Sequence, residues 1–142
     1  MTETAAASSS GVQSRPIALV TGASAGFGQA IARRLVAEGY RVIAAARRLS
    51  RLETLAQDLG DALYPLELDV TDLKAVRALP QSLPEDWQAV DVLVNNAGLA
   101  LGLERAWQAD GDDWETMIAT NISGLVEMTR ALLPGMVERN RG

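Results

Sequence analysis

Short apolar runs alternate with amphipathic stretches from residue 17 to the end of the chain. Unbroken apolar runs are typical of parallel strands that are buried on both faces. The unbroken run 17–20 predicts such a strand, and the mainly apolar stretches 40–45, 63–68 and 90–94 predict three more. Apolar residues three or four positions apart predict helices. These helices are expected at 29–38, 50–59 and 72–79, with a long one from Asp112 or Asp113 to about Arg139.

Local signals refine two of these boundaries. Ser50, with Glu53 three residues later, has the pattern of a capping box, in which the serine side chain caps the helix start. Two prolines between Pro80 and Trp87 predict a loop there, because proline lacks the amide hydrogen that a helix interior needs.

Four strand–helix units in strict alternation predict an α/β fold. The expected architecture is a Rossmann-type, doubly wound parallel sheet in three α/β/α layers, truncated after the fourth strand and its helix. Ligands of such sheets bind beyond the carboxyl ends of the strands. The turns that follow the predicted strands are rich in Gly, Ala, Ser or Asn, so we expect the functional residues at that edge.

Composition excludes several classes of function. The chain has no cysteine and no histidine, which rules out disulfides, Cys/His zinc sites and Ser–His or Cys–His catalysis, and no metal site is expected. A net charge of −5 with dispersed acids argues against a nucleic-acid partner. No apolar run approaches membrane-spanning length, so no membrane partner is expected.

The first residues differ in character from the rest. Residues 1–15 are rich in Ala and Ser and lack the basic start and apolar stretch of a secretory signal, so a disordered leader and a cytoplasmic protein are expected. Residues 16–142 are expected to form the N-terminal part of a single nucleotide-binding Rossmann domain.

A glycine-rich turn follows the first predicted strand. In Thr21–Gly28, Gly22 permits a tight turn, Gly26 removes a side chain where backbone amides would approach a pyrophosphate, and Gly28 allows close helix packing. The helix that follows offers free amides and a partial positive charge, and Ser24 adds a hydroxyl donor. A purely structural turn is the alternative. The residues expected to contact the phosphates are Gly22, Ala23, Ser24, Ala25, Gly26 and Phe27.

The end of the second predicted strand indicates which nicotinamide cofactor is preferred. An enzyme that prefers NAD places a carboxylate there, whereas the 2′-phosphate of NADP calls for arginine. Here three alanines lead to Arg47 and Arg48, and no acid occurs between Tyr40 and Leu52. A guanidinium can donate two hydrogen bonds to a phosphate, so we expect NADP. Solvated surface arginines are the alternative.

Taken together, these motifs resemble the short-chain dehydrogenase/reductase family, whose turn reads T-G-x-x-x-G-x-G. The resemblance recurs at Asp69-Val70, at Asn95–Gly98 and at Asn121. Three stretches look like bacterial NADP-dependent 3-hydroxy acid dehydrogenases, which oxidise serine, allo-threonine and related acids or reduce malonic semialdehyde. These stretches are Asn95–Gly102, Asp113–Ile118 and Leu133–Asn140.

The resemblance implies roles for five more residues. Asp69 would accept a hydrogen bond from the adenine amino group while the Val70 backbone touches the base. Asn96 would lie against the cofactor, and Asn95 would help to hold the sheet. Asn121 would bend its helix and hold a water of the proton relay beside the catalytic lysine. The plainer alternatives are a helix cap for Asp69, a role that Thr71 or Asp72 can fill, and a structural asparagine at 121.

Family members commonly pair the long helix with its copy in a second subunit, which implies a homo-oligomer, a dimer or a tetramer. The helix carries a broad apolar stripe that is consistent with such pairing. The stripe comprises Trp114, Ile118, Leu125, Thr129 and Leu132, widened by Met117, Ile122 and Val126.

The family's remaining catalytic groups, a serine on a fifth strand and a Tyr-x-x-x-Lys pair on a fifth helix, are missing from these 142 residues. The tyrosines are Tyr40 and Tyr64, and neither precedes the only lysine, Lys74, by four positions. We therefore expect the N-terminal part of an oxidoreductase that acts on a small-molecule substrate, without efficient turnover by itself. The alternative is a non-catalytic NADP-binding or regulatory module.

Overall fold

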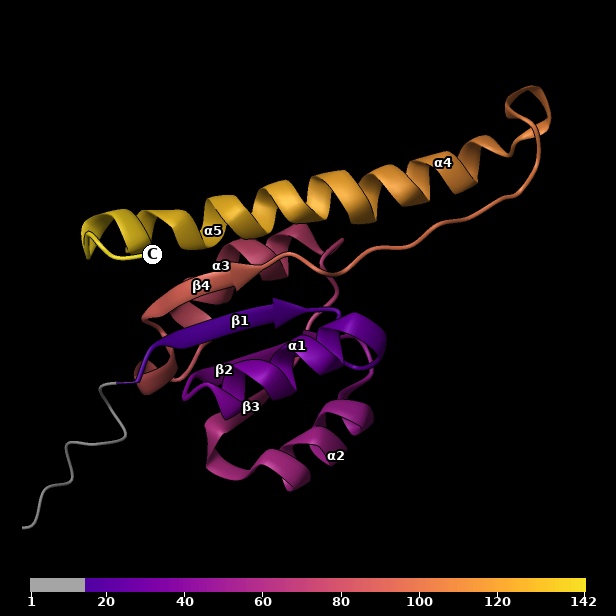
Figure 1. Cartoon of the computed structure of the whole chain (residues 1–142). Helices are drawn as coiled ribbons and strands as arrows, with labels where there is room; N and C mark the ends of the chain where they lie inside the picture. The colour runs from indigo at the N-terminus through magenta and orange to yellow at the C-terminus, as the bar shows by residue number, and fades with distance from the viewer. Residues whose placement is uncertain (1–14) are drawn as a thin grey trace, which may run out of the picture.

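The computed structural model describes residues 15–142 (Figure 1). The leader predicted for residues 1–15 therefore lies almost wholly outside the described residues. Within them, no helix combines the length and the apolar character that crossing a bilayer requires.

A parallel four-stranded sheet forms the centre of the fold, in the order β3-β2-β1-β4. The strands are β1 (Ile17–Thr21), β2 (Arg41–Ala46), β3 (Leu63–Glu67) and β4 (Val90–Val94), each within one residue of its predicted bounds. The chain runs from β1 outward to β3 and then returns to the other side of β1. The carboxyl ends of β1 and β4 therefore meet at the point where the topology switches direction.

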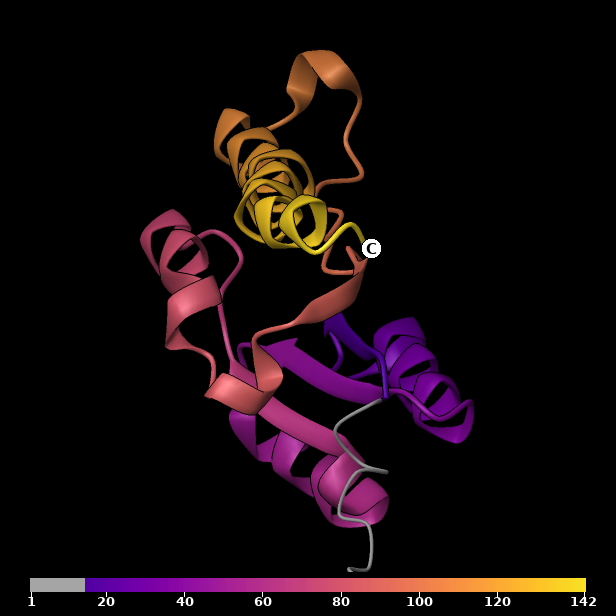
Figure 2. The same cartoon turned by 90° about the vertical axis from the view of Figure 1, so that its left-hand side faces the viewer.

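Helices cover both faces of this sheet, which confirms the predicted three layers (Figure 2). On one face, α1 (Gly26–Ala37) and α2 (Leu49–Leu59) pack over the side chains of Val20, Val42 and Ala44. On the other face, α3 (Leu73–Ser82) and α5 (Leu125–Glu138) enclose Leu19, Ile43 and Met128. β1 and β2 are buried throughout because both of their faces are covered.

The long C-terminal helix is one rod with a change of helical type in its middle. It comprises α4 (Gly111–Ile118), a π-helical segment (Ala119–Gly124) and α5. It begins one or two residues before the predicted start, because Asp110 is the residue that caps it, accepting from the Asp112 amide at 2.9 Å. The short 3₁₀ turns are Gly60–Ala62, Glu85–Trp87 and Ala106–Gln108.

The capping box predicted at Ser50 is wrong. Helix α2 begins at Leu49, and Arg48 occupies the capping position without a side-chain hydrogen bond. Ser50 therefore lies inside the first turn, where its carbonyl accepts a hydrogen bond from the Thr54 hydroxyl at 3.1 Å. A capping side chain must come from a residue with non-helical backbone angles, and that residue here is Arg48.

The prediction of a loop from Pro80 is also wrong for its first residues. Helix α3 continues through Pro80 to Ser82, so the proline lies inside it. Val76, Leu79 and Leu83 are buried in the core on either side of the proline. Their burial outweighs the one backbone hydrogen bond that proline cannot make.

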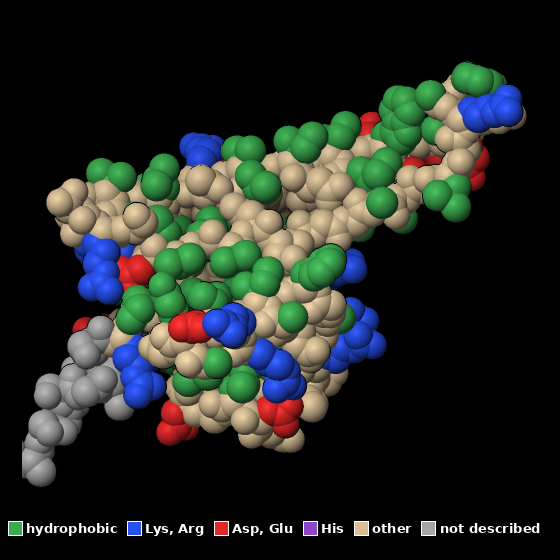
Figure 3. Space-filling model, in the orientation of Figure 1, with side chains coloured by type: hydrophobic (Ala, Val, Ile, Leu, Met, Phe, Trp, Pro, Cys, Tyr) green, Lys and Arg blue, Asp and Glu red, His purple; other side chains and the backbone are tan. Residues whose placement is uncertain are grey.

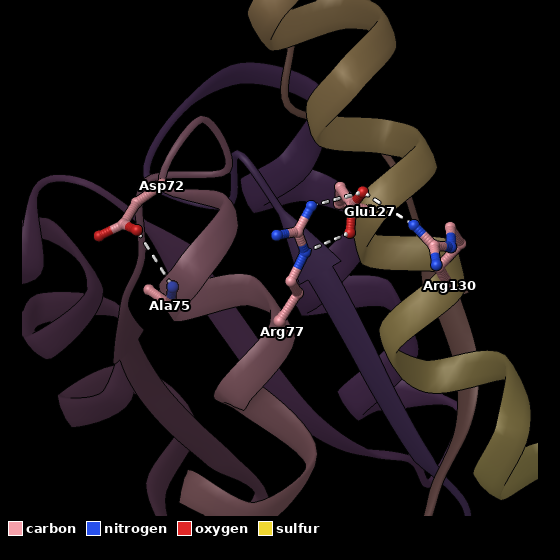
Figure 4. A network of polar contacts seen from close by, with 5 residues as sticks. All are labelled: Asp72, Ala75, Arg77, Glu127 and Arg130. Carbon is pink, nitrogen blue, oxygen red and sulfur yellow. Dashed lines mark hydrogen bonds and ion pairs between the residues drawn. The ribbon is translucent and has the colours of Figure 1, made fainter.

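A charged cluster joins α3 to α5 (Figure 4). Glu127 of α5 is only 9% exposed, and both of its carboxylate oxygens accept hydrogen bonds from Arg77 of α3, at 3.1 and 3.2 Å. Arg130 adds a third contact at 3.1 Å. Two guanidiniums thus neutralise one largely buried carboxylate, and the cluster fixes the two helices against each other.

The outer side of the long helix carries exposed apolar side chains, visible as a row along the upper edge of Figure 3. They are Trp114, Ile118, Ile122, Leu125, Val126, Leu133 and Val137. Leu132, which the sequence places in the same stripe, is instead buried against the sheet. The helix thus has two apolar sides, one in the core and one on the surface.

Candidate functional site

A cavity of about 320 Å³ lies beyond the carboxyl ends of the strands. The turns that follow all four strands contribute to its wall, and the long helix closes one side. The residues that line it are Gly22, Ser24, Ala25, Ala46, Arg47, Arg48, Leu68, Asp69, Val70, Thr71, Ala97, Gly98, Leu99, Thr116 and Thr120. Its volume is within the range of small-molecule and cofactor sites.

The glycine-rich turn is folded as tightly as its sequence predicts. Gly22 has a φ of +65°, a conformation that residues with side chains rarely adopt. A side chain on Gly28 would collide with the Gly22 carbonyl oxygen and would lie 2.5 Å from the side-chain amide of Asn96. The start of α1 therefore packs directly against the turn.

The N-terminus of α1 is open toward solvent. Ala25 occupies the capping position without a side-chain hydrogen bond. A side chain built on Gly26 would meet no atom within 4 Å, so there is free space in front of the helix. The first amides of an α-helix have no partner within the helix, and they carry its positive end. The arrangement suits an anion such as a phosphate.

Not every residue of the turn faces the cavity. Ala23 is fully buried, and its amide donates to the Ala45 carbonyl at 3.1 Å, so it links the ends of β1 and β2. Phe27 is 85% exposed and, like Gly26, does not line the cavity. Phe27 therefore does not belong to the buried side of its helix, although its spacing from Ile31 and Leu35 suggests that it would.

Arg47 and Arg48 both line the cavity, and Arg48 reaches across it toward the glycine-rich turn. Its Nη2 donates to the Ser24 hydroxyl at 3.3 Å. Arg33 and Arg34, by contrast, are paired with Asp58 and Glu38 on the helix surface. Arg47 and Arg48 therefore line the cavity because they follow a strand, whereas Arg33 and Arg34 lie on a helix and form ion pairs at its surface.

Asp69 lies on the cavity wall after β3. Its Oδ1 accepts from the Thr71 amide at 2.9 Å and from the Thr71 hydroxyl at 2.7 Å. Burial acts to raise the pKa of Asp69, but the Thr71 hydrogen bonds and the charge of Arg47 outweigh it and lower that pKa. The cap of α3 is Asp72, which accepts from the Ala75 amide at 3.1 Å (Figure 4). Asp69 is therefore not the helix cap.

Asn96 lies one layer behind the cavity. Its side-chain amide donates to the carbonyls of Thr21 and Gly22, at 3.0 and 3.3 Å, while the Thr21 hydroxyl accepts from the Asn96 backbone amide. Asn96 thus ties the end of β4 to the glycine-rich turn, which is the kind of task that the sequence assigns to Asn95. Asn95 instead donates to Thr129 of α5 at 3.2 Å.

Asn121 is exposed and holds the chain that follows β4. Its Oδ1 accepts from the Leu99 amide at 2.9 Å and its Nδ2 donates to the Leu99 carbonyl at 2.8 Å. It lies in the π-helical segment, so the local change of helix geometry that the sequence predicts at this residue is confirmed. Because Leu99 lines the cavity, Asn121 supports the cavity wall from behind.

Sequence reasoning missed the contribution of the long helix to the cavity. Thr116 and Thr120 line it, one turn apart on the same side of the rod. The signal available in the sequence was their four-residue spacing just before Asn121, which places both hydroxyls on one side of the helix. Nothing local in the sequence indicates that this side faces the turn after β3.

The two tyrosines lie away from the cavity. Tyr64 of β3 packs on Trp87, with ring centroids 5.5 Å apart, and Tyr40 packs against the α1–α2 side of the sheet. Neither these residues nor Lys74 line the cavity. Among residues 15–142, the cavity wall thus offers amides, hydroxyls, two guanidiniums and one carboxylate.

Comparison with known proteins gives the same picture. The profile of the short chain dehydrogenase family matches residues 16–142. The NADP-dependent 3-hydroxy acid dehydrogenase YdfG of Escherichia coli is 58% identical over 126 residues, which are 89% of this chain and 51% of that protein. The serine 3-dehydrogenase of Rhizobium radiobacter is 49% identical, over 85% of this chain and 49% of that protein.

Solved structures agree with these matches. The closed form of a serine dehydrogenase complexed with NADP+ superposes with a TM-score of 0.86 at 58% identity, over 89% of this chain and 51% of that one. A metagenomic short-chain oxidoreductase in complex with NADP gives 0.83 at 32% identity, over 89% and 59%. The chain spans about half the length of the curated relatives it matches.

Proposed function

The chain belongs to the short chain dehydrogenase family, and on that premise we propose that the whole protein is an NADP(H)-dependent oxidoreductase. It would transfer a hydride to or from the alcohol or carbonyl carbon of a small 3-hydroxy acid. The observation that carries the proposal is the placement of Arg47, Arg48 and Ser24 at one cavity with an uncapped helix N-terminus.

The cavity residues fit the parts of NADP one by one. The open amides of α1 and the empty space at Gly26 suit the pyrophosphate. Arg47 and Arg48 suit the 2′-phosphate, since guanidinium groups pair with phosphate oxygens in a forked geometry. Asp69 uses Oδ1 for both hydrogen bonds from Thr71, and Oδ2 would accept from the adenine amino group while Val70 borders the base. Ala97, Gly98 and Leu99 border the end of the cavity that is left for the nicotinamide half.

In this proposal the residues of this chain bind and orient the cofactor. The cofactor, when bound, supplies or accepts the hydride. The arginines would hold its 2′-phosphate and the α1 amides its pyrophosphate, and Asn121 holds the wall at Leu99 by two hydrogen bonds. Each polar atom of the Asn121 side chain can make a second hydrogen bond, and the residue would use one of these or its backbone carbonyl to hold a relay water.

The proton donor would come from elsewhere in the whole protein. No tyrosine of this chain lines the cavity, and no Tyr-x-x-x-Lys pair occurs in its sequence. In the complete enzyme such a pair would join the cavity beside the Leu99 wall. The 142 residues alone would then bind the cofactor without efficient turnover.

The substrate class rests on the relatives. The proteins at 58% and 49% identity are named for 3-hydroxy acids and for serine. We infer the same class here, with serine, allo-threonine and 3-hydroxypropionate as the compounds to test. The exposed apolar row of the long helix further supports a homo-oligomer, since such a row is costly to leave in water.

One experiment tests cofactor and activity together. Purified full-length protein is titrated with NADPH and with NADH while cofactor fluorescence is followed, and is then assayed with NADP+ and the three 3-hydroxy acids. We expect tighter binding of NADPH and reduction of NADP+ by at least one acid. Equal affinity for both cofactors would refute the NADP assignment. Binding without turnover of any acid would instead favour a non-catalytic NADP-binding or regulatory module.

A further inference from the structure

The π-helical segment ends at a glycine that packs against the cavity wall. Gly124 is buried, and a side-chain carbon built on it would lie 2.9 Å from Val70 Cγ2 and 3.0 Å from the Val70 carbonyl oxygen. Contacts this short do not occur between real atoms of these kinds, so the helix reaches Val70 only because residue 124 has no side chain. Val70 itself lines the cavity beside Asp69.

The Asp69–Val70 turn has little freedom to yield. The Thr71 amide and hydroxyl both donate to Asp69 Oδ1, and the Asp72 amide donates to the Asp69 carbonyl at 3.0 Å. Val70 is 8% exposed and belongs to the core cluster that includes Met128. A side chain at position 124 would therefore move the helix rather than the turn.

The helix would carry part of the cavity wall with it. Thr120, one turn before Gly124, lines the cavity, and Asn121 is bonded to Leu99 on the wall opposite the arginines. The segment from Thr120 to Gly124 therefore borders the cavity: Gly124 packs against Val70, and Asn121 near its other end holds Leu99. Its distance from Val70 fixes how wide the cavity is beside Asp69.

We propose that Gly124 is a positioning residue for cofactor binding, because its missing side chain sets the gap between Thr120 and the Asp69–Val70 turn. This inference rests on the proposed function, which assigns that part of the cavity to adenine. Substitution at 124 should therefore weaken ligands that carry the adenine half of NADP more than ligands that carry only the nicotinamide half, which the shift reaches only through the Asn121–Leu99 hydrogen bonds.

The test compares ligands that carry different halves of the cofactor. Full-length wild type and Gly124→Ala are titrated with 2′,5′-ADP, which has the adenine and the 2′-phosphate, and with reduced nicotinamide mononucleotide, which has neither. We expect the Kd of 2′,5′-ADP to rise roughly tenfold, the change that about 1.4 kcal/mol produces. The Kd of the mononucleotide should rise clearly less, by roughly threefold at most, because the shift reaches its end of the cavity only through the Asn121–Leu99 hydrogen bonds.

Gly135→Ala is the matched control on the same helix rod. A side chain there would meet only the Arg139 guanidinium, 2.9 Å from Nη1, and that group donates to the carbonyl of Val90 at the start of β4, the end away from the cavity. This variant should bind both ligands like the wild type. Equal losses of both ligands in Gly124→Ala, or no loss of either, would overturn the proposal.

The double variant Gly124→Ala/Val70→Ala keeps the test decisive if the single variant does not fold. Removing the Val70 methyl groups relieves the 2.9 Å contact, so folding and part of the 2′,5′-ADP affinity should return together. A double variant no better than the single one would contradict the proposal. Failure of the wild type to bind 2′,5′-ADP would count against the proposed function instead.

Discussion

The side-chain amide of Asn121 pairs with the backbone of a single residue, Leu99, through both of its polar atoms. The two hydrogen bonds measure 2.9 and 2.8 Å and join residues 22 positions apart in the sequence. An uncharged amide side chain can accept from the N–H and donate to the C=O of one residue through two different atoms. The pairing explains why an asparagine stands beside the apolar stripe of this helix.

Asn121→Ala should therefore loosen the wall at Leu99. Two hydrogen bonds are lost, at about 1 kcal/mol each, so the free energy of unfolding should fall by roughly 1–2 kcal/mol. The Kd of NADPH should rise as well, because the wall becomes mobile. Chemical denaturation and fluorescence titration measure the two effects. Asn121→Asp, which keeps only the acceptor, should fall between wild type and alanine.

Ser123→Ala, in the same π-helical segment, is the control for Asn121. It should leave stability and affinity unchanged. If Asn121→Ala changed turnover but neither stability nor NADPH affinity, a relay role would be favoured over the clamp.

Arg47 and Arg48 should decide between NADP and NAD. Replacing both with alanine removes charge-assisted hydrogen bonds, each worth about 1.5–3 kcal/mol, so NADPH should bind at least roughly tenfold more weakly. NADH, which lacks the 2′-phosphate, should change by less than about threefold. Titration of both cofactors with the Arg47→Ala/Arg48→Ala variant checks this. Arg33→Ala/Arg34→Ala removes the same charge from the helix surface and should alter neither affinity. Equal weakening of NADPH and NADH would contradict a 2′-phosphate site.

Gly28→Ala should disrupt the glycine-rich turn. The added carbon would collide with the Gly22 carbonyl and press on the Asn96 amide, and overpacking of this kind typically costs about 1–3 kcal/mol. We expect a lower midpoint of unfolding and weaker binding of NADPH. Gly111→Ala, where an added carbon meets nothing within 4 Å, should be harmless. Unchanged stability and affinity in Gly28→Ala would show that the turn is less tightly packed than the structure indicates.

The cluster around Glu127 should make stability depend on pH. The hydrogen bonds from Arg77 lower the pKa of Glu127 below its ordinary value of 4.5, although burial acts in the opposite direction. A lowered pKa in the folded state means that the unfolded state takes up the proton more readily. The stabilisation is therefore fully present above about pH 4.5 and is lost as the pH falls through the folded-state pKa.

Thermal melts of wild type and Glu127→Gln across pH test this dependence. At neutral pH the variant should melt a few degrees lower, and the two Tm curves should approach each other at acid pH. Glu115→Gln on the exposed side of α4 serves as the control and should follow the wild type. A constant difference at every pH would mean that packing, rather than charge, holds α3 against α5.

Local patterns in the sequence determined most of the fold. Mainly apolar runs placed the four strands within one residue of their bounds, because a strand in a layered sheet needs apolar side chains on its covered faces. The spacing of Gly22, Gly26 and Gly28 indicated the turn, and two arginines after a strand indicated the cavity edge, since both signals depend only on neighbouring residues.

Only the tertiary structure decided the rest, because the deciding contacts join residues far apart in the chain. Burial of Leu79 and Leu83 kept Pro80 helical, and the approach of the long helix to Val70 brought Thr116 and Thr120 to the cavity. Asn96 turned toward Gly22, 74 positions away, rather than toward the cavity. Such partners are chosen by packing, which no short stretch of sequence encodes.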